Sequence, residues 1–553
     1  MLEQKKPNFL KGAAILAATG VFVKIVGAIY QIPILRTMGD EGAGYFHVTY
    51  MVYAFILAIS TAGIPVALSR LVSAAAARGN IPLVKRYYSV AMPVFIVIGL
   101  VAMLVMFFFA DGIADLMNTS LAAYGIRVLA PAVFFVCIIS VYRGYAQGFQ
   151  NMIPTAASQL IEVISKAVIG LAVAFYLARL GYQSQYVSAG AIVGVTVGMG
   201  LCVPVMIWYK RKIDRKQAND ESDESEISDI KSPELISRSS ALFKFLKVSF
   251  TISLSASFMS IMGVIDTSVV SNRLQSALML TESEAVAQLG IYRRGISIFN
   301  LPPSLVVPLV MSIIPAIAAA IAQKNKKEAN EIMQSSIKLT NLFAMPACAG
   351  IMVLAGPILS ALYYDPSRSP QAVAAMTTIL FILGAASYFV CLQHVTIATL
   401  QANGYERVAL MTFPVGAFIR IALSWILVGN PAFGIIGSPI ATLVCFMIIV
   451  ILNTLFIKLK VKARFKPVSV FIKPLMCALL MAAVAYFTYT GANRLATDIF
   501  GSGQRIVILS LAAAVLIGVI VYVALVIFTK TITKEDLSYV PKGEKIAKLL
   551  RVK

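Results

Sequence analysis

The sequence predicts an all-α integral membrane protein with about 14 transmembrane helices, and three observations lead to this fold class. Of the 553 residues, 59% are hydrophobic and only 13% are charged, whereas about a quarter of a soluble globular chain is charged. Apolar runs of about 20 residues, long enough to cross a hydrocarbon core, recur along the whole chain. Most of the 47 Lys and Arg fall in alternate loops between these runs, which is the charge asymmetry of membrane proteins.

The apolar runs are expected to be helices, because backbone groups in lipid must be satisfied internally and the runs lack the strict alternation of a barrel. The first run is too long for a cleaved signal peptide and contains Lys24, so it is expected to be the first span. The basic loops place both termini in the cytoplasm. The expected spans, give or take one, are residues 12–35, 44–68, 88–110, 122–146, 154–178, 186–209, 246–271, 290–322, 338–362, 372–400, 406–428, 434–457, 468–490 and 506–529.

Composition also excludes several classes of function. The formal net charge of +22 follows from the topology and does not require a nucleic acid partner. The six Cys fall inside apolar runs without a CxxC pair, and neither His47 nor His394 has a second ligand at metal spacing. The sequence contains no nucleotide-binding Walker motif. We therefore expect no cofactor, no disulfide and no direct hydrolysis of ATP.

One segment interrupts the apolar rhythm. From Lys210 to about Arg238, basic residues are followed by the acidic, Ser-rich run DESDESEISD, a composition that predicts a flexible cytoplasmic linker. The expected organisation is an N-terminal lobe of six helices at 1–209, the linker at 210–240, a C-terminal lobe of six helices at 241–460, helices 13 and 14 at 461–530, and a basic cytoplasmic tail at 531–553.

The two expected lobes resemble each other in sequence. The segment FVCIISVYRGYAQGFQ, which starts at Phe135, resembles FVCLQHVTIATLQANG, which starts at Phe389, and the same offset places Lys166 on Arg420. Each lobe has an even number of spans, so the two are expected to be parallel repeats, an arrangement found among secondary transporters. Two lobes with a cleft between them would suit alternating access across a membrane.

Particular stretches carry a family resemblance: the opening GVFVKIVGAIYQIPILRTMGDEGAGYF, the eighth-span segment IYRRGISIFNLPPSLVVPLVMSIIPAI, and the layout of two times six spans plus two. Over essentially its whole length, the chain resembles the polysaccharide-biosynthesis branch of the multidrug/oligosaccharidyl-lipid/polysaccharide (MOP) exporter superfamily. Within that branch it is most similar to the stage V sporulation protein B and YtgP group, relatives of the MurJ lipid II flippases.

The resemblance implies a MOP/MATE-like bundle in a bacterial cytoplasmic membrane that acts as a flippase and not as an enzyme. The implied substrate is an undecaprenyl-pyrophosphate-linked sugar, foremost the peptidoglycan precursor lipid II, moved from the inner to the outer leaflet. Membrane lipids are implied partners, and a partnership with the cell-wall synthesis machinery stays open. The sugar carried, the oligomeric state and the energy source also stay open.

The candidate substrate-binding residues are cations. Ionised side chains at membrane depth cost about 2.5–3.5 kcal/mol, so they usually face water or a partner. Cations outnumber anions at that depth here, which suits a lipid-linked pyrophosphate. The resemblance places Lys24 where MurJ-like proteins carry an arginine in a similar FSRVLG setting, and Arg294 at a further cavity arginine. The expected cavity residues are Lys24, Arg294, Arg293, Arg36 and Arg70.

Four further charges are expected to serve structure or coupling. Glu162 and Lys166 are spaced i, i+4 with the acid first, the favourable order for a pair within one helix. Asp266 and Arg420 each stand alone on their helices and are expected to pair. Some MurJ-like proteins bind sodium through an aspartate on helix 7, so Asp266 is a candidate sodium ligand. Arg420 would compete with such a cation, and whether a metal binds stays open.

Other functions remain alternatives. An ion-coupled multidrug exporter of the MATE branch fits the layout, but its typically cationic substrates would be repelled by a cationic cleft. A flippase for another lipid-linked oligosaccharide fits as well. A membrane glycosyltransferase or polymerase would need paired carboxylates, whereas Asp111, Asp115 and Asp365 in the outer loops form no paired-acid motif. A scaffold for the cell-wall machinery would lack transport activity.

Overall fold

All secondary structure in the described part of the chain is helical. The computed structural model describes residues 7–61, 64–76, 79–149, 151–224, 237–307, 317, 321, 325–363, 369–461, 467–501 and 503–532. The regular elements in these ranges are α, 3₁₀ and π helices. The predicted all-α class is confirmed.

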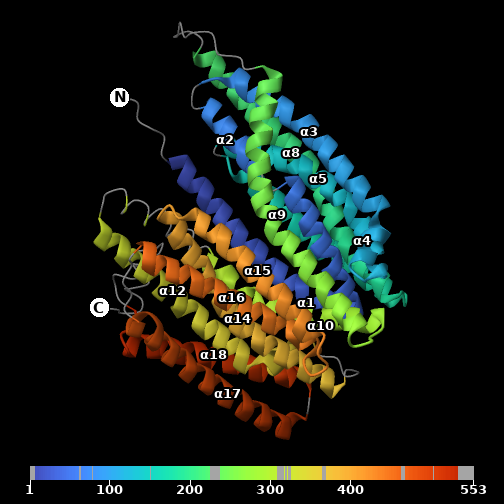
Figure 1. The fold of residues 1–553 in the computed structure, drawn as a ribbon, viewed down its shortest axis with the longest axis vertical. Helices are drawn as coiled ribbons and strands as arrows, with labels where there is room; N and C mark the ends of the chain where they lie inside the picture. The colour runs from blue at the N-terminus through green and yellow to red at the C-terminus, as the bar shows by residue number, and fades with distance from the viewer. Residues whose placement is uncertain are drawn as a thin grey trace. The chain divides into compact units, whose positions relative to one another are not determined.

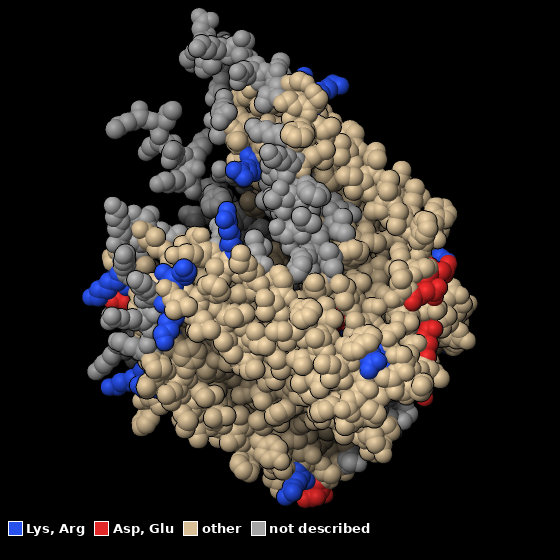
Figure 2. Space-filling model, in the orientation of Figure 1, with Lys and Arg blue, Asp and Glu red and all other residues tan. Residues whose placement is uncertain are grey.

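Ten helical segments in these ranges are long and apolar enough to span a membrane, and each overlaps a predicted span. The four remaining predicted spans, 12–35, 44–68, 246–271 and 290–322, fall on segments described only in part. Charged side chains are sparse on the face shown in Figure 2, as expected where a surface meets lipid. The protein is a multi-pass membrane protein. The ten segments are Ile81–Phe108, Ser120–Gly148, Ile153–Arg179, Ser184–Arg215, Lys327–Val353, Pro370–Ala402, Met411–Val428, Gly434–Val461, Val468–Ile499 and Gln504–Phe528.

The chain divides into two compact units. Unit 1 contains Met1–Gln275 and Leu280–Gly290, and unit 2 contains Ser276–Met279 and Ile291–Lys553. The boundary between the two units therefore falls inside α10 (Glu282–Phe299). These units are defined by contacts, whereas the predicted lobes are defined by repeats, and the predicted lobe boundaries stay a prediction.

Unit 1 is built around α5 (Ala123–Gly148), which packs against α1, α2, α3 and α8. Figure 1 shows α3, α5 and α8 running side by side. The buried residues of α2, α3 and α5, among them Leu68, Val84 and Val141, form one continuous apolar core. The helices of this unit are α1 (Pro7–Thr61), α2 (Ile64–Ala76), α3 (Ile81–Phe108), α4 (Ala110–Leu116), η1 (Ser120–Ala122), α5, α6 (Ile153–Ser165), η2 (Lys166–Gly170), α7 (Leu171–Arg179), α8 (Ser184–Glu224), α9 (Arg238–Ser276, the last residue in unit 2) and the first half of α10.

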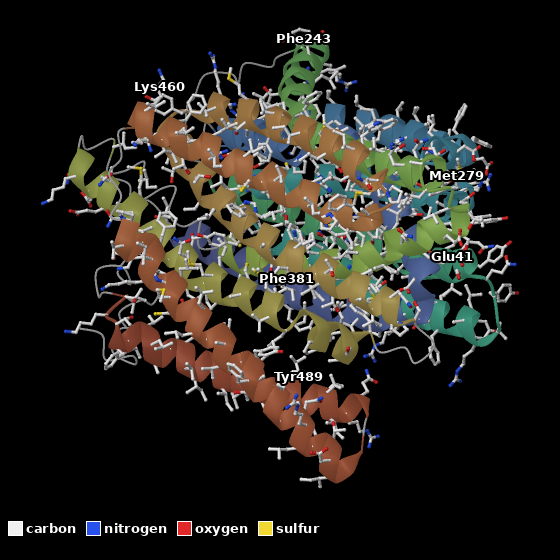
Figure 3. All side chains as sticks on the ribbon, turned by 60° about the horizontal axis from the view of Figure 1, so that its bottom comes forward. Glu41, Phe243, Met279, Phe381, Lys460 and Tyr489 are labelled. Atoms are coloured by element: carbon white, nitrogen blue, oxygen red, sulfur yellow. The ribbon has the colours of Figure 1, made fainter. Side chains whose placement is uncertain are left out.

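Unit 2 is built around α14 (Pro370–Ala402), which packs against α12, α15 and α16. The C-terminal pair α17 and α18 lie side by side as a hairpin (Figure 1), and α17 also packs against α12. Figure 3 places Lys460 at the end of η4 and Tyr489 on α17. The other helices of this unit are α12 (Lys326–Val353), α13 (Ala355–Leu362), α15 (Glu406–Val428), η3 (Gly434–Ile436), α16 (Gly437–Phe456), η4 (Ile457–Val461), η5 (Val468–Ile472), α17 (Lys473–Phe500) and α18 (Gln504–Phe528).

Two helix breaks follow from local chemistry. In α1, Gly39 has φ 70° and ψ −171°, a conformation that glycine adopts without a Cβ clash, and it separates the first two predicted spans. α10 ends at Phe299, and helix resumes at residues 301–307. Pro302 and Pro303 lie in the first turn of this new helix, where the missing N–H of proline costs nothing. The segment predicted as the eighth span, 290–322, is therefore interrupted at Asn300.

The predicted flexible linker begins as an ordered helix, which corrects one expectation. α8 continues without interruption to Glu224, well past the expected start of the linker at Lys210. The extension is docked: Tyr145 donates a hydrogen bond of 2.8 Å to Asp214 Oδ1, and Ile213 is buried in the apolar core of unit 1. Composition alone missed these contacts with α5. Residues 225–236 of the linker lie outside the described residues.

Candidate functional site

An ion pair joins α5 and α6 inside unit 1. Nη2 of Arg143 lies 3.6 Å from Oε2 of Glu162, and the two side chains are 17% and 35% exposed. Nε of Arg143 also donates a hydrogen bond of 2.8 Å to Ser158 Oγ. Arg143 was not among the predicted site residues, because it lies near the end of its apolar run and its partner is distant in sequence. The predicted pairing of Glu162 with Lys166 stays a prediction.

Lys166 lies between two tyrosine rings. Its Nζ is 4.6 Å from the ring centre of Tyr50 and 5.6 Å from that of Tyr30. The two tyrosines belong to α1 and stand on opposite sides of the break at Gly39. Contacts of this kind stabilise a cation by about 0.5–2 kcal/mol, depending on how well it is desolvated. The Tyr30 side chain is 6% exposed, and its hydroxyl has no hydrogen-bond partner.

The backbone that carries Lys166 is a π-helical turn, η2, inserted between α6 and α7. Glycines let α8 approach this turn: a Cβ at Gly170 would lie 2.5 Å from the carbonyl oxygen of Ala191, and a Cβ at Gly194 would overlap the backbone nitrogen of Gly170. Single π turns inside α-helices occur frequently at functional sites. This turn was not predicted from the sequence.

A buried arginine is the central feature of unit 2. Arg294 of α10 is 2% exposed, and its guanidinium carbon lies 5.0 Å from the ring centre of Tyr363. Arg293 beside it is half-buried. Tyr292 on the same helix shares a hydrogen bond of 3.3 Å with Thr442 of α16. The guanidinium therefore makes a cation–π contact with Tyr363, and a guanidinium is the group that binds phosphate oxygens in bidentate fashion.

A second polar group in unit 2 was missed by the sequence analysis. Tyr388 of α14 donates a hydrogen bond of 3.1 Å to Asn341 Oδ1 of α12, and Asn341 Nδ2 donates one of 2.7 Å to the carbonyl oxygen of Val470. Lys338, one turn before Asn341, is 5% exposed. Lys338 is the first residue of the predicted span 338–362 and was not among the predicted site residues. The run of Ser, Lys, Thr and Asn around it is the signal that a buried polar face was present.

The other predicted site residues are scattered over the two units. The side chain of Lys24 lies outside the described residues, although its backbone is helical in α1. Arg36 and Arg70 are exposed. Asp266 is 4% exposed and belongs to unit 1, whereas Arg420 is half-buried and belongs to unit 2. Their predicted pairing stays a prediction.

Two cavities are lined almost wholly by apolar side chains. One, of about 340 Å³, lies in unit 1 between α1, α4 and α9 and is lined by Phe55, Leu116 and Ile265 among others. The second, of about 430 Å³, lies in unit 2 between α12, α13 and the hairpin of α17 and α18. Neither offers the charged groups that would bind a polar headgroup. In the part of the chain that the structure describes, no three His, Cys, Asp or Glu side chains gather as metal ligands.

Two protein families match the chain. The family described as polysaccharide biosynthesis protein matches residues 9–321, which is more than half of the sequence. The MatE family matches residues 251–426.

Relatives with nearly the same length come from Bacillus subtilis (strain 168). The chain is 27% identical over 547 residues to an uncharacterized membrane protein, YabM, covering 98% of this chain and 96% of the relative. It is 24% identical to stage V sporulation protein B over 97% of this chain and 98% of that protein. It is also 24% identical to the lipid II flippase MurJ over 75% of this chain and 77% of that protein.

The fold is also that of a solved structure. The structure of a lipid II flippase MurJ in an inward closed conformation matches with a TM-score of 0.68 and 17% sequence identity. The match covers 94% of this chain and 99% of the solved chain. At this identity, the likeness establishes the fold alone.

Proposed function

The chain belongs to the polysaccharide biosynthesis protein family, within the MOP superfamily, and from this membership we propose that it is a flippase for a lipid-linked sugar. It moves an undecaprenyl-pyrophosphate-linked sugar from the inner to the outer leaflet of the bacterial cytoplasmic membrane by alternating access. Both chain termini lie in the cytoplasm, because the basic loops fall on that side. The substrate is lipid II, which is the molecule named in one relative and in the matching structure.

The observation that carries this proposal is the burial of Arg294 in a membrane protein. A guanidinium at membrane depth is costly unless a partner or a ligand offsets the cost, and charged groups there usually mark a substrate pathway. The guanidinium lies against the Tyr363 ring, and a guanidinium can bind a pyrophosphate in bidentate fashion. Lys24, Arg293, Arg36 and Arg70 are proposed as further cations that bind the substrate.

A MATE-type multidrug exporter is the second candidate, because residues 251–426 match the MatE family. The two candidates differ in the charge of the substrate. Drugs exported by MATE-type proteins are typically cationic, and Arg294 would repel them, whereas a pyrophosphate is attracted.

The test is transport by the purified full chain in lipid vesicles. Fluorescent lipid II, another fluorescent undecaprenyl-pyrophosphate-linked oligosaccharide and a cationic dye are offered in parallel, and accessibility of each label from outside is followed over time. Faster equilibration of lipid II than in protein-free vesicles supports the proposal. Transport of the second lipid-linked sugar alone would correct the substrate, transport of the dye alone would favour the exporter, and no transport of any probe would contradict all three.

A further inference from the structure

One face of α8 changes from apolar to cationic near the end of its membrane-spanning segment. Trp208, Arg211, Lys212 and Arg215, here called the α8 stripe, are all exposed. The three cations follow Trp208 by three, four and seven residues, a spacing that places all four side chains on one side of a helix. We propose that the α8 stripe binds the headgroup of an anionic phospholipid. This proposal does not depend on which substrate the chain transports.

The α8 stripe continues a row of exposed apolar side chains on the same face of the helix. Val197, Leu201 and Pro204 precede Trp208 at steps of three or four residues, and all three are exposed. Exposed apolar side chains on a membrane-spanning helix meet the lipid tails. Tryptophan is enriched where the tails give way to the headgroups. The cations that follow Trp208 on this face therefore lie at the level of the lipid headgroups.

Contacts on the opposite side of α8 hold the helix in this rotation. Ile213 is buried in the apolar core of unit 1, and Tyr145 of α5 donates a hydrogen bond of 2.8 Å to Asp214 Oδ1. Lys210 forms an ion pair with Asp214, and its Nζ lies 4.7 Å from the ring centre of Tyr88 on α3. Because the helix is already docked, its cations are presented before any lipid binds, and little further ordering is needed.

The chemistry of the α8 stripe suits a phosphate. Two guanidinium groups can bind phosphate oxygens in bidentate fashion, and Nζ of Lys212 lies 5.3 Å from the ring centre of Trp208, which keeps this ammonium beside the interfacial indole. Asp214 is the one carboxylate in the sequence from Trp208 to Arg215, and it belongs to the docked side. Clusters of basic residues next to a span attract anionic lipids in this way.

Cations also flank membrane spans because they set the topology, and that role does not require a bound lipid. Topology depends on how many basic residues a loop contains and not on which face of a helix carries them. In α8, the three cations share the face that carries the apolar row. The α8 stripe rises about 10 Å along the helix axis, and the headgroup region of one leaflet is about 5–8 Å thick. Shared face and matching length favour a lipid ligand over topology alone.

The test measures lipid binding to the purified full chain by native mass spectrometry, with phosphatidylglycerol, phosphatidylethanolamine and undecaprenyl pyrophosphate as separate probes. Each of Arg211→Gln, Lys212→Gln and Arg215→Gln is expected to weaken phosphatidylglycerol binding about 5-fold, and the triple variant about 20-fold or more. Binding of phosphatidylethanolamine, which has no net charge, is expected to stay unchanged. A variant with Arg211→Lys and Arg215→Lys retains the charge and is expected to bind phosphatidylglycerol within about 3-fold of wild type.

A matched control separates the α8 stripe from the overall charge of the protein. Lys85 of α3, Arg238 of α9 and Arg407 of α15 are exposed cations near the ends of three different helices. The triple variant Lys85→Gln, Arg238→Gln, Arg407→Gln loses the same net charge as the triple variant of the stripe. It is expected to bind phosphatidylglycerol within about 3-fold of wild type, because its cations do not lie together on one face.

Several outcomes would overturn the proposal. One is a monodisperse triple variant of the stripe that binds phosphatidylglycerol like wild type, and another is equal weakening by the two triple variants. An equal loss of phosphatidylethanolamine binding would show that the stripe does not recognise headgroup charge. Loss of undecaprenyl pyrophosphate binding without loss of phosphatidylglycerol binding would assign the stripe to a lipid-linked pyrophosphate instead. If the triple variant does not fold, Lys212→Gln is compared with Lys85→Gln, and equal binding by these two overturns the proposal.

Discussion

The guanidinium of Arg143 lies 3.6 Å from the carboxylate of Glu162, so that α5 and α6 of unit 1 share a partly buried ion pair. Removing one partner leaves the other charge without its counter-charge, whereas removing both partners leaves no charge at this place. We expect Arg143→Gln and Glu162→Gln each to destabilise the protein, and the double variant to be less destabilised than their sum by about 1–2 kcal/mol. Thermal unfolding in detergent measures this coupling.

A second double-mutant cycle serves as the control for this prediction. The cycle of Glu162→Gln with Lys166→Met tests the alternative pairing within one helix, which contributes about 0.2–0.5 kcal/mol in isolated helices. A larger coupling for Glu162 with Lys166 than for Glu162 with Arg143 would contradict the observed geometry.

Two glycines let α1 and α10 pack backbone against backbone within unit 1. A Cβ at Gly290 would overlap the carbonyl oxygen of Asp40, and a Cβ at Gly44 would overlap that of Val286. We expect Gly290→Ala to destabilise this contact by about 1–3 kcal/mol, because backbone atoms must move to admit the methyl group. Gly20→Ala is the control: nothing lies within 4 Å of that Cβ, and alanine is favoured over glycine in a helix by about 0.5–1 kcal/mol. We therefore expect Gly290→Ala to lower the unfolding temperature and Gly20→Ala to raise it. Equal changes in the two variants would contradict the packing argument.

The polar network at the start of α10 extends this contact. Ser283 donates a hydrogen bond of 2.8 Å to Glu41, the residue labelled in Figure 3. Gly290→Ala is therefore expected to speed hydrogen exchange at the beginning of α10, in addition to lowering the unfolding temperature.

Hydropathy predicted the spans well, but it did not predict which side chains contact one another. The predicted span 506–529 corresponds to Gln504–Phe528, and 434–457 to Gly434–Val461, because lipid forces an apolar run of this length into a helix. The pair of Arg143 with Glu162 joins different helices, and no local pattern records such a contact.

The same limit explains why neither the helical start of the linker nor the π turn at Lys166 was predicted. Acidic, Ser-rich composition predicted disorder after Lys210, but Asp214 and Ile213 dock the extension of α8 on unit 1, and tertiary contacts override composition. The π turn at Lys166 depends on how closely α8 approaches through Gly194, which is a property of packing and has no counterpart in hydropathy.

The start of α10 contains a capping box whose strength depends on pH. Thr281 donates from its backbone N–H and its hydroxyl to Glu284 Oε2, both at 2.9 Å, and the N–H of Glu284 donates to Thr281 Oγ1. The backbone hydrogen bond from Thr281, followed by that from its hydroxyl, lowers the pKa of Glu284 below its ordinary value. The cap is therefore fully formed above the ordinary pKa and is lost as pH falls through the lowered pKa.

We expect Thr281→Ala to raise the pKa of Glu284 only part of the way to its ordinary value, because the stronger contribution, the backbone N–H, remains. A carboxyl NMR titration of Glu284 measures this shift. Ser283→Ala, whose hydroxyl contacts Glu41 instead, should leave the titration unchanged. A Glu284 pKa that does not respond to Thr281→Ala would show that the hydroxyl hydrogen bond is absent in solution.

The topology proposed from the basic loops predicts that position 225, just after α8 ends at Glu224, lies in the cytoplasm. A cysteine at Ser225 should react with an impermeant maleimide only after the cells are permeabilised. A cysteine at Ser120, in the predicted outer loop and exposed, should react in intact cells. The six native cysteines are buried, so the background is low. Labelling of Ser225→Cys in intact cells would show that the protein has the opposite orientation in the membrane.

The last prediction concerns the cations proposed to bind the pyrophosphate, Lys24 and Arg294. Arg294 is almost fully buried against Tyr363, so truncation to alanine would also remove packing. Methionine keeps most of the side-chain volume and removes the charge. We expect Lys24→Met and Arg294→Met each to lower the initial rate of lipid II transport in vesicles by about 10- to 100-fold. This fold-change corresponds to the free energy of one hydrogen bond to a charged group. Lys24→Arg retains the charge and should stay active.

The control for this prediction is an arginine in a similar aromatic contact elsewhere. Arg179 lies 4.7 Å from the Phe175 ring centre at the end of α7, and Arg179→Met should transport at the wild-type rate. Blotting for protein in the vesicles separates a lost contact with the substrate from lost abundance. Because a cation that only stabilised the fold would lower abundance and rate together, a normal amount of inactive protein is the result that assigns Lys24 and Arg294 to the substrate. If the Lys24→Met, Arg294→Met double variant is well incorporated and transports lipid II at the wild-type rate, neither residue binds the substrate.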